Sequence, residues 1–147
     1  MTNQIETHAE KALKLFDKGN NCAQAVLSAF SEELGLDERE ALRLAASFGG
    51  GIGGMKGVCG ALTGLFMAAG LKYGYEAFEP GTDVKAVKDA HNKRIQGLAE
   101  AFRQRFGAID CASLLKAIDE DPEWKAMKRP CSVYVAAACE LMEKLED

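Results

Sequence analysis

The fold is decided by the stretch VCGALTGLFMAAGLKY, residues 58–73 of the 147-residue chain. Its small residues recur at helical spacing, at Gly60, Gly64 and Ala68, and such spacing lets a neighbouring helix approach closely. Bulky apolar side chains fill most of the remaining positions, so a helix here is apolar nearly all round and is expected to be buried. The stretch therefore predicts a central, glycine-rich helix. Its small-residue face could serve either packing inside one chain or a homodimer.

The rest of the chain is also patterned for helices, because apolar residues recur every three or four positions and strand-like alternation is almost absent. We expect seven helices, over residues 4–17, 22–34, 38–48, 58–73, 84–106, 111–118 and 131–145. Residues 119–129 are expected to form a polar loop. Since the sequence shows no linker, low-complexity tract or internal repeat, it predicts one all-α domain over residues 1–147, a bundle of about six to seven helices.

Composition and charge exclude several classes of protein. The net charge of −4 argues against nucleic acid as a partner, which requires a clustered basic face. The longest nearly apolar run, residues 58–71, is too short to span a bilayer. The N-terminal MTNQIETHAEKALKLF lacks the basic and apolar regions of a secretory signal, so we expect a cytoplasmic protein. In that reducing compartment cysteines are more often catalytic, redox-sensing or metal-binding than joined in structural disulfides.

Four of the five cysteines each stand at the start of a predicted helix, just after a helix breaker or cap. They are Cys22, Cys59, Cys111 and Cys131. A helix N-terminus carries partial positive charge and unpaired N–H groups, which favour the thiolate, and the thiolate is both the nucleophile and the metal ligand. The fifth, Cys139, lies mid-helix in an alanine run and is interpreted as a packing residue.

The spacing of these cysteines does not form a local motif, because no two of them are arranged as CxxC. Any shared site must be assembled by tertiary folding. If the four converge, a cysteine pair could cycle between dithiol and disulfide, or four thiolates could hold an iron–sulfur cluster or another metal such as a closed tetrahedral zinc. The alternative is that all are small buried apolar residues in a non-catalytic helical interaction domain.

A second unusual feature is the glycine loop, GGGIGG at residues 49–54. It satisfies the pattern G-x-G-x-x-G, but a dinucleotide site needs a preceding strand, and here a helix precedes the loop. One interpretation is that the loop backbone forms a concavity for an anion or a sulfur atom. The other is a flexible connector between two helices. If the loop backbone forms such a concavity, we expect six glycines to bind a cofactor: Gly49, Gly50, Gly51, Gly53, Gly54 and Gly60.

Several segments together resemble one known family. They are NCAQAV at residues 21–26, the glycine loop, CGALTG at residues 59–64, and the later Cys111 and Cys131. This combination resembles the C_GCAxxG_C_C family of redox-active proteins, whose members have about this length, four hallmark cysteines and a CGAxxG motif. The resemblance covers nearly the whole chain and implies that the hallmark cysteines are the same four that helix-start placement selects.

The sequence thus predicts a cysteine-based redox protein, either a thiol–disulfide relay or an electron carrier, that acts with an unidentified redox partner protein. The alternative is an iron–sulfur or other metal-binding module in which Cys22, Cys59, Cys111 and Cys131 are ligands. Cys59 is expected to be the most reactive cysteine, because it combines a helix start, the glycine loop and the nearby Lys56.

Overall fold

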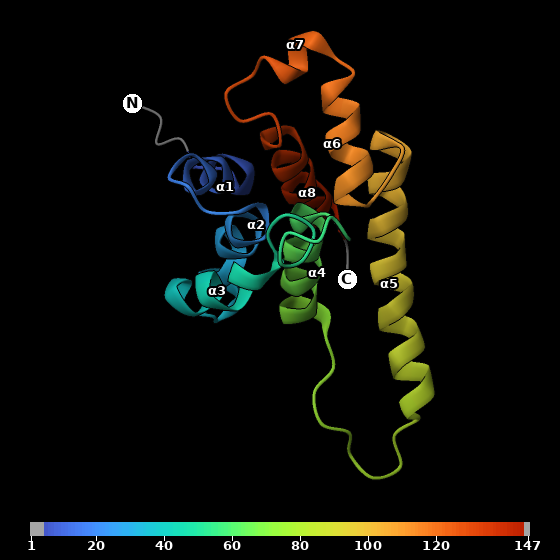
Figure 1. Ribbon diagram of the computed structural model, residues 1–147. Coiled ribbons are helices and arrows are strands. Elements are labelled where there is room, and N and C mark those ends of the chain that lie inside the picture. The colour runs from blue at the N-terminus through green and yellow to red at the C-terminus, as the bar shows by residue number, and fades with distance from the viewer. Residues whose placement is uncertain (1–4, 146–147) are drawn as a thin grey trace.

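The computed structural model describes residues 5–145, and in this range it is all-α, as predicted (Figure 1). The eight α-helices of the described residues are α1 His8–Asp17, α2 Cys22–Ser31, α3 Glu38–Ala45, α4 Gly60–Tyr73, α5 Val84–Phe106, α6 Cys111–Asp119, α7 Pro122–Lys125 and α8 Ser132–Lys144. Two short 3₁₀ helices, η1 Glu32–Leu34 and η2 Ala46–Phe48, extend α2 and α3. None of the helices in the described range combines the length and apolar character needed to cross a membrane.

The predicted central helix is confirmed, and its glycines explain how it packs. Helix α4 makes its most extensive contacts with α2. A Cβ atom at Gly64 would lie 2.8 Å from the Ala23 carbonyl oxygen and 3.0 Å from the Val26 Cβ. One at Gly60 would lie 3.1 Å from the Phe48 carbonyl oxygen. The small-residue face therefore serves internal packing, and the CGAxxG motif contains the two glycines that let α4 approach α2.

This close approach predicts opposite effects of one substitution at two positions of α4. Gly64→Ala should destabilise the protein by about 2 kcal/mol, because the backbone of α2 cannot yield as a flexible side chain would. Gly70→Ala should stabilise it by about 0.5–1 kcal/mol, since nothing lies within 4 Å of a Cβ there and alanine is the better helix former. Chemical denaturation of both variants measures the difference. Equal shifts in the same direction would contradict this account of the packing.

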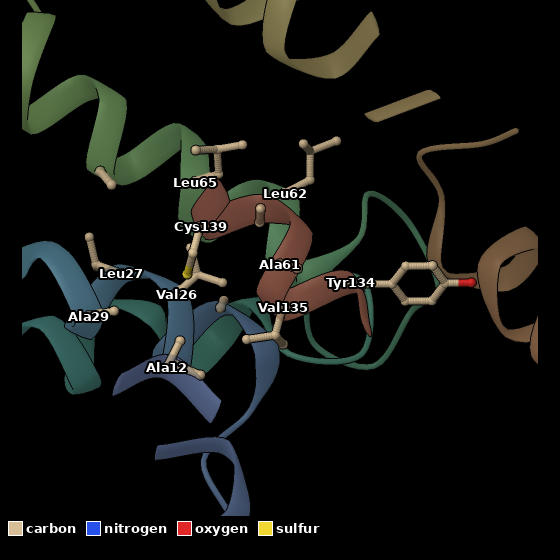
Figure 2. Packing of buried hydrophobic residues seen from close by; sticks show 14 of the residues in the cluster. Ala12, Val26, Leu27, Ala29, Ala61, Leu62, Leu65, Tyr134, Val135 and Cys139 are labelled. Atoms are coloured by element: carbon tan, nitrogen blue, oxygen red, sulfur yellow. The ribbon is translucent and has the colours of Figure 1, made fainter. Parts of the chain in front are cut away.

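The hydrophobic core lies where α1, α2, α4 and α8 meet (Figure 2). Val26 and Leu27 of α2, Leu62 of α4 and Val135 of α8 are fully buried in it. Cys139 of α8 is also fully buried in this cluster, and this position confirms the packing interpretation. Three residues that helical periodicity would place inward are instead exposed: Ile5 at 92%, Leu44 at 53% and Val84 at 37%.

Helix α5 is the longest of the described helices, and most of its length is not buried. Its bounds are as predicted, because the Asp83 side chain accepts a hydrogen bond from the Ala86 amide and Gly107 ends the helix in the left-handed conformation. Only Leu98 and Phe102 of its 23 residues are buried. Figure 1 shows its N-terminal half extending past the end of α4.

Two predicted boundaries are wrong. The first helix is expected from residue 4, which lies outside the described residues, but α1 begins at His8 because Thr7 caps it, accepting a hydrogen bond from the Glu10 amide at 3.1 Å. The expected polar loop over residues 119–129 contains the short helix α7, which starts with Pro122 at the first helical position and is capped by the Asp121 side chain, which accepts from the Glu123 and Trp124 amides.

Candidate functional site

The four cysteines at helix starts come together in one cavity of about 180 Å³. Each comes from a different helix N-terminus: Cys22 and Cys111 are the first residues of α2 and α6, and Cys59 and Cys131 are the caps of α4 and α8. The rest of the lining is Gly50, Gly51, Lys56, Gly60, Leu114, Leu115 and Tyr134. Cys139 is not part of it. Tertiary folding thus supplies the convergence that sequence spacing leaves open.

Local hydrogen bonds explain the placement of Cys22. The Asn21 side chain accepts from the Gln24 amide at 2.8 Å, and the Gln24 side chain accepts from the Asn21 amide at 2.9 Å, which together form a capping box. The same Asn21 side chain donates to the Ala46 carbonyl at 3.2 Å. A Cβ at Gly49 would lie 2.7 Å from this side chain. The start of α2 is therefore fixed against the segment that enters the glycine loop.

A short antiparallel bridge between Val58 and Asp110 places Cys59 and Cys111. The Cys59 amide donates to the Ile109 carbonyl at 2.8 Å, and the Cys111 amide donates to the Gly57 carbonyl at 2.6 Å. In such a pairing the two cysteines are diagonal neighbours on one face. Both side chains therefore reach the same cavity, although the residues are far apart in sequence.

The glycine loop is an ordered left-handed turn that forms one wall of the cavity. The five residues from Gly50 to Gly54 all have positive φ, including Ile52 at 66°. A positive φ costs little conformational free energy for glycine and more for any other residue. The amides of Gly53, Gly54, Lys56 and Gly57 donate to carbonyls between Ser47 and Gly51 at 2.7–3.0 Å.

This hydrogen bonding decides against one of the two sequence interpretations of the loop. Because those four amides are used within the loop, the turn is too fully hydrogen-bonded for a flexible connector, whereas a concavity for an anion or a sulfur atom stays a prediction. Of the six glycines expected to bind a cofactor, Gly50, Gly51 and Gly60 line the cavity. The other three, Gly49, Gly53 and Gly54, do not line the cavity.

The comparison with protein families agrees with this constellation. Residues 20–145 match the family model described as "Putative redox-active protein (C_GCAxxG_C_C)". The chain belongs to the C_GCAxxG_C_C family. No match was found among curated proteins or solved structures. The family match covers all four converging cysteines, the glycine loop and α4.

In this family member the thiols of Cys22 and Cys131 are hydrogen-bonded to each other. The hydrogen bond from Cys22 lowers the pKa of Cys131 to about 7, and the charges of Arg129 and Lys56 act in the same direction, against the opposing effect of burial. The same bond raises the pKa of Cys22, together with its burial. The pair therefore holds one thiol and one group poised to be a thiolate near neutral pH.

Cys59, which is expected to be the most reactive cysteine, has a higher pKa than Cys131. Burial raises its pKa to about 11, although the backbone amides of Ala61 and Leu62 favour its thiolate. Burial also raises the pKa of Cys111, partly offset by the charge of Lys56. The helix-start argument identified a real effect, but desolvation outweighs it at Cys59.

The pKa of Cys131 predicts a pH-dependent alkylation rate. Because the thiolate is the nucleophile and the pKa is lowered, the rapid reaction with iodoacetamide should be present above pH 7 and lost as pH falls through 7. A thiol of this pKa is roughly 1% thiolate at pH 5, so the rate there should be roughly 100-fold below its plateau. Mass-spectrometric rates at each cysteine test this. A single slow phase with a midpoint above pH 9 would contradict it.

Three cavity residues were not singled out as part of the site by sequence reasoning: Leu114, Leu115 and Tyr134. Tyr134, buried, stands three residues after Cys131 in α8 and donates from its hydroxyl to the Leu114 carbonyl of α6 at 2.7 Å (Figure 2). Its position one turn after a helix-start cysteine was the available signal. Leu114 and Leu115, on α6, give no comparable signal. No group of three or more His, Cys, Asp or Glu side chains between residues 5 and 145 is arranged to hold a metal ion.

Proposed function

We propose that this protein is a thiol–disulfide redox carrier in which Cys22 and Cys131 form the primary pair. The observation that supports it most is that these two cysteines, from α2 and α8, line one cavity with two further cysteines, where the hydrogen bond from the Cys22 thiol lowers the pKa of Cys131. A hydrogen-bonded pair of thiols can close a disulfide with little movement of the chain, and one thiolate near neutral pH supplies the nucleophile.

The course of thiol–disulfide exchange follows from the different pKa values of Cys131 and Cys22. The Cys131 thiolate attacks one sulfur of a partner's disulfide, the S–S bond breaks, and the leaving thiolate takes up a proton. Cys22 then gives up its proton and attacks the Cys131 sulfur of the mixed disulfide, which releases the second partner thiol. Two electrons have passed from the protein dithiol to the partner disulfide. With a reduced partner the steps run in reverse, and in a reducing cytoplasm the carrier would rest as the dithiol.

We assign Cys59 and Cys111 to a second dithiol that exchanges with the first. Their place on one face of the Val58–Asp110 bridge supports this pairing. Their raised pKa values make them slow to attack an external disulfide, but suit them to receive oxidation from the Cys22–Cys131 disulfide within the cavity. The partner that finally receives or supplies the electrons is a separate redox protein or small molecule.

A second candidate is an electron-carrying module that binds an iron–sulfur cluster. It is favoured by the convergence of four cysteines, each at a helix start, on one cavity rather than in two separate pairs. Cys22, Cys59, Cys111 and Cys131 would hold such a cluster, and the group would supply one-electron transfer. The hydrogen bond of Cys22 to Cys131, which favours a thiolate at Cys131 alone, favours the dithiol chemistry instead.

Disulfide mapping tests the proposal. The reduced protein is oxidised with substoichiometric diamide, the remaining thiols are alkylated, and peptides are assigned by mass spectrometry. We expect a Cys22–Cys131 disulfide first and a Cys59–Cys111 disulfide at higher oxidant, both reversed by dithiothreitol. The matched control is Cys139→Ala, which should leave this order unchanged. Thiols that resist oxidation, or pairs formed at random, would contradict the proposal.

A further inference from the structure

Beside the cysteine cavity lies a separate groove of about 570 Å³ that the redox chemistry above does not use. It runs between α1 and the segment that leads into α8, and its lining is Leu13, Asp17, Met127, Lys128, Arg129 and Ser132. Its volume lies within the range of pockets that bind small molecules, roughly 300–1,000 Å³. A groove of this size next to a reactive thiol is suited to hold the molecule that the thiol attacks.

The groove and the cysteine cavity meet at the start of α8. Ser132 lines the groove, and the preceding residue, Cys131, lines the cavity. Two contacts hold this turn in place. The Arg129 guanidinium lies 3.9 Å from the ring centre of Phe16 in α1, and the Trp124 indole donates to the Pro130 carbonyl at 2.9 Å. A ligand in the groove would therefore lie beside a fixed turn that carries the nucleophile.

The charged residues of the groove indicate the charge of the ligand that it would bind. Lys128 and Arg129 supply two cations on one side, and Asp17 supplies one carboxylate on α1. This local excess of positive charge stands in a chain whose net charge is −4. The complementary ligand carries carboxylates in excess of ammonium groups, which is the charge pattern of peptides built from acidic amino acids. Leu13 and Met127 offer apolar contact to its carbon chain.

We propose that this groove binds a low-molecular-mass, amino-acid-derived disulfide with net negative charge, and presents its S–S bond to Cys131. The inference rests on the proposed thiol–disulfide function and names its substrate class. Lys128 and Arg129 bind the carboxylates, and Asp17 binds an ammonium group. The step is the exchange described above, in which the bound disulfide is reduced to two thiols and the Cys22–Cys131 dithiol is oxidised to the disulfide.

The test compares three disulfides of different charge. Oxidised glutathione is anionic, 2-hydroxyethyl disulfide is neutral and cystamine is cationic. We expect the reduced protein to react with them in that order of decreasing rate, and added salt should slow only the reaction with oxidised glutathione. Lys128→Glu should slow the reaction with oxidised glutathione about tenfold and leave that with 2-hydroxyethyl disulfide unchanged.

The control variant is Lys125→Glu, which makes the same charge change on the neighbouring helix α7 but outside the groove lining. It should have little effect on any of the three rates. Lys128 is not among the charges that set the pKa of Cys131, so the alkylation profile of Lys128→Glu should match that of the native protein.

Two outcomes would overturn the groove assignment and leave the thiol chemistry standing: equal rates with all three disulfides, or equal losses in Lys128→Glu and Lys125→Glu. Failure of the native protein to react with any of the three would instead overturn the proposed function, and the substrate assignment with it.

Discussion

Replacement of Cys131 by serine should lower the rate of disulfide exchange at pH 7 about 100-fold. With a pKa of about 7, roughly half of Cys131 is thiolate at this pH, whereas Cys59, with a pKa of about 11, is roughly one part in ten thousand thiolate. The more basic Cys59 thiolate is intrinsically more nucleophilic than that of Cys131. On a logarithmic scale, this offsets about half of the rate difference that the thiolate fractions alone would give. Stopped-flow measurement with 2-hydroxyethyl disulfide gives the rate without involving the charged groove.

Two further variants test whether the loss of rate is specific to Cys131. Cys139→Ala should keep the native rate, because Cys139 is fully buried outside the cavity and burial raises its pKa to about 12. Cys22→Ser should accumulate a stable mixed disulfide on Cys131, since the thiol that resolves it is gone. If Cys131→Ser reacts as fast as the native protein, another cysteine is the nucleophile and the assignment of the pair is wrong.

The second large effect is expected at Gly51, where alanine should destabilise the protein by about 3 kcal/mol. The residue has φ +74°, a conformation that costs an L-residue roughly 1–2 kcal/mol. In addition, its Cβ would lie 2.5 Å from the Gly57 nitrogen and 2.7 Å from the Lys56 Cα. These are backbone atoms of the same turn, so relief requires a shift of the cavity wall, at a typical cost of about 1–3 kcal/mol. Urea unfolding measures the loss.

Gly54→Ala provides the matched control. Its φ of +73° is nearly the same, but a Cβ there would meet nothing within 4 Å. The expected loss is only the conformational part, roughly 1–2 kcal/mol. The difference in unfolding free energy between the two variants measures the contribution of the close contact between Gly51 and the backbone of residues 56 and 57. Equal losses would show that this approach does not support the turn.

Much of the fold could be predicted from local signals. The helix periodicity predicts the helices to within a few residues, and the structure shows side-chain caps at Asn21, Asp83 and Asp110 at three of the helix starts. These signals work because each depends on residues that are neighbours in sequence. The shared helix-start position of the four cysteines was informative in the same way, since it selected the four that line the cavity and set Cys139 apart.

The reactivity of individual thiols could not be predicted, because it depends on contacts across the fold. The Cys22–Cys131 hydrogen bond joins residues from α2 and α8, and burial at Cys59 depends on the packing of several helices. The charge of Lys56, three residues before Cys59, lowers the pKa of Cys111 and Cys131 instead.

The most direct test of the account is the metal, sulfide and thiol content of protein purified without oxygen or added metal. We predict a colourless protein with all five cysteines titrating as thiols on denaturation, and a count that falls in steps of two on mild oxidation and recovers with dithiothreitol. Iron with acid-labile sulfide and visible absorption would contradict the dithiol carrier and make the four cavity cysteines cluster ligands. About one zinc per chain would contradict it as well, since closed structural zinc sites do not cycle.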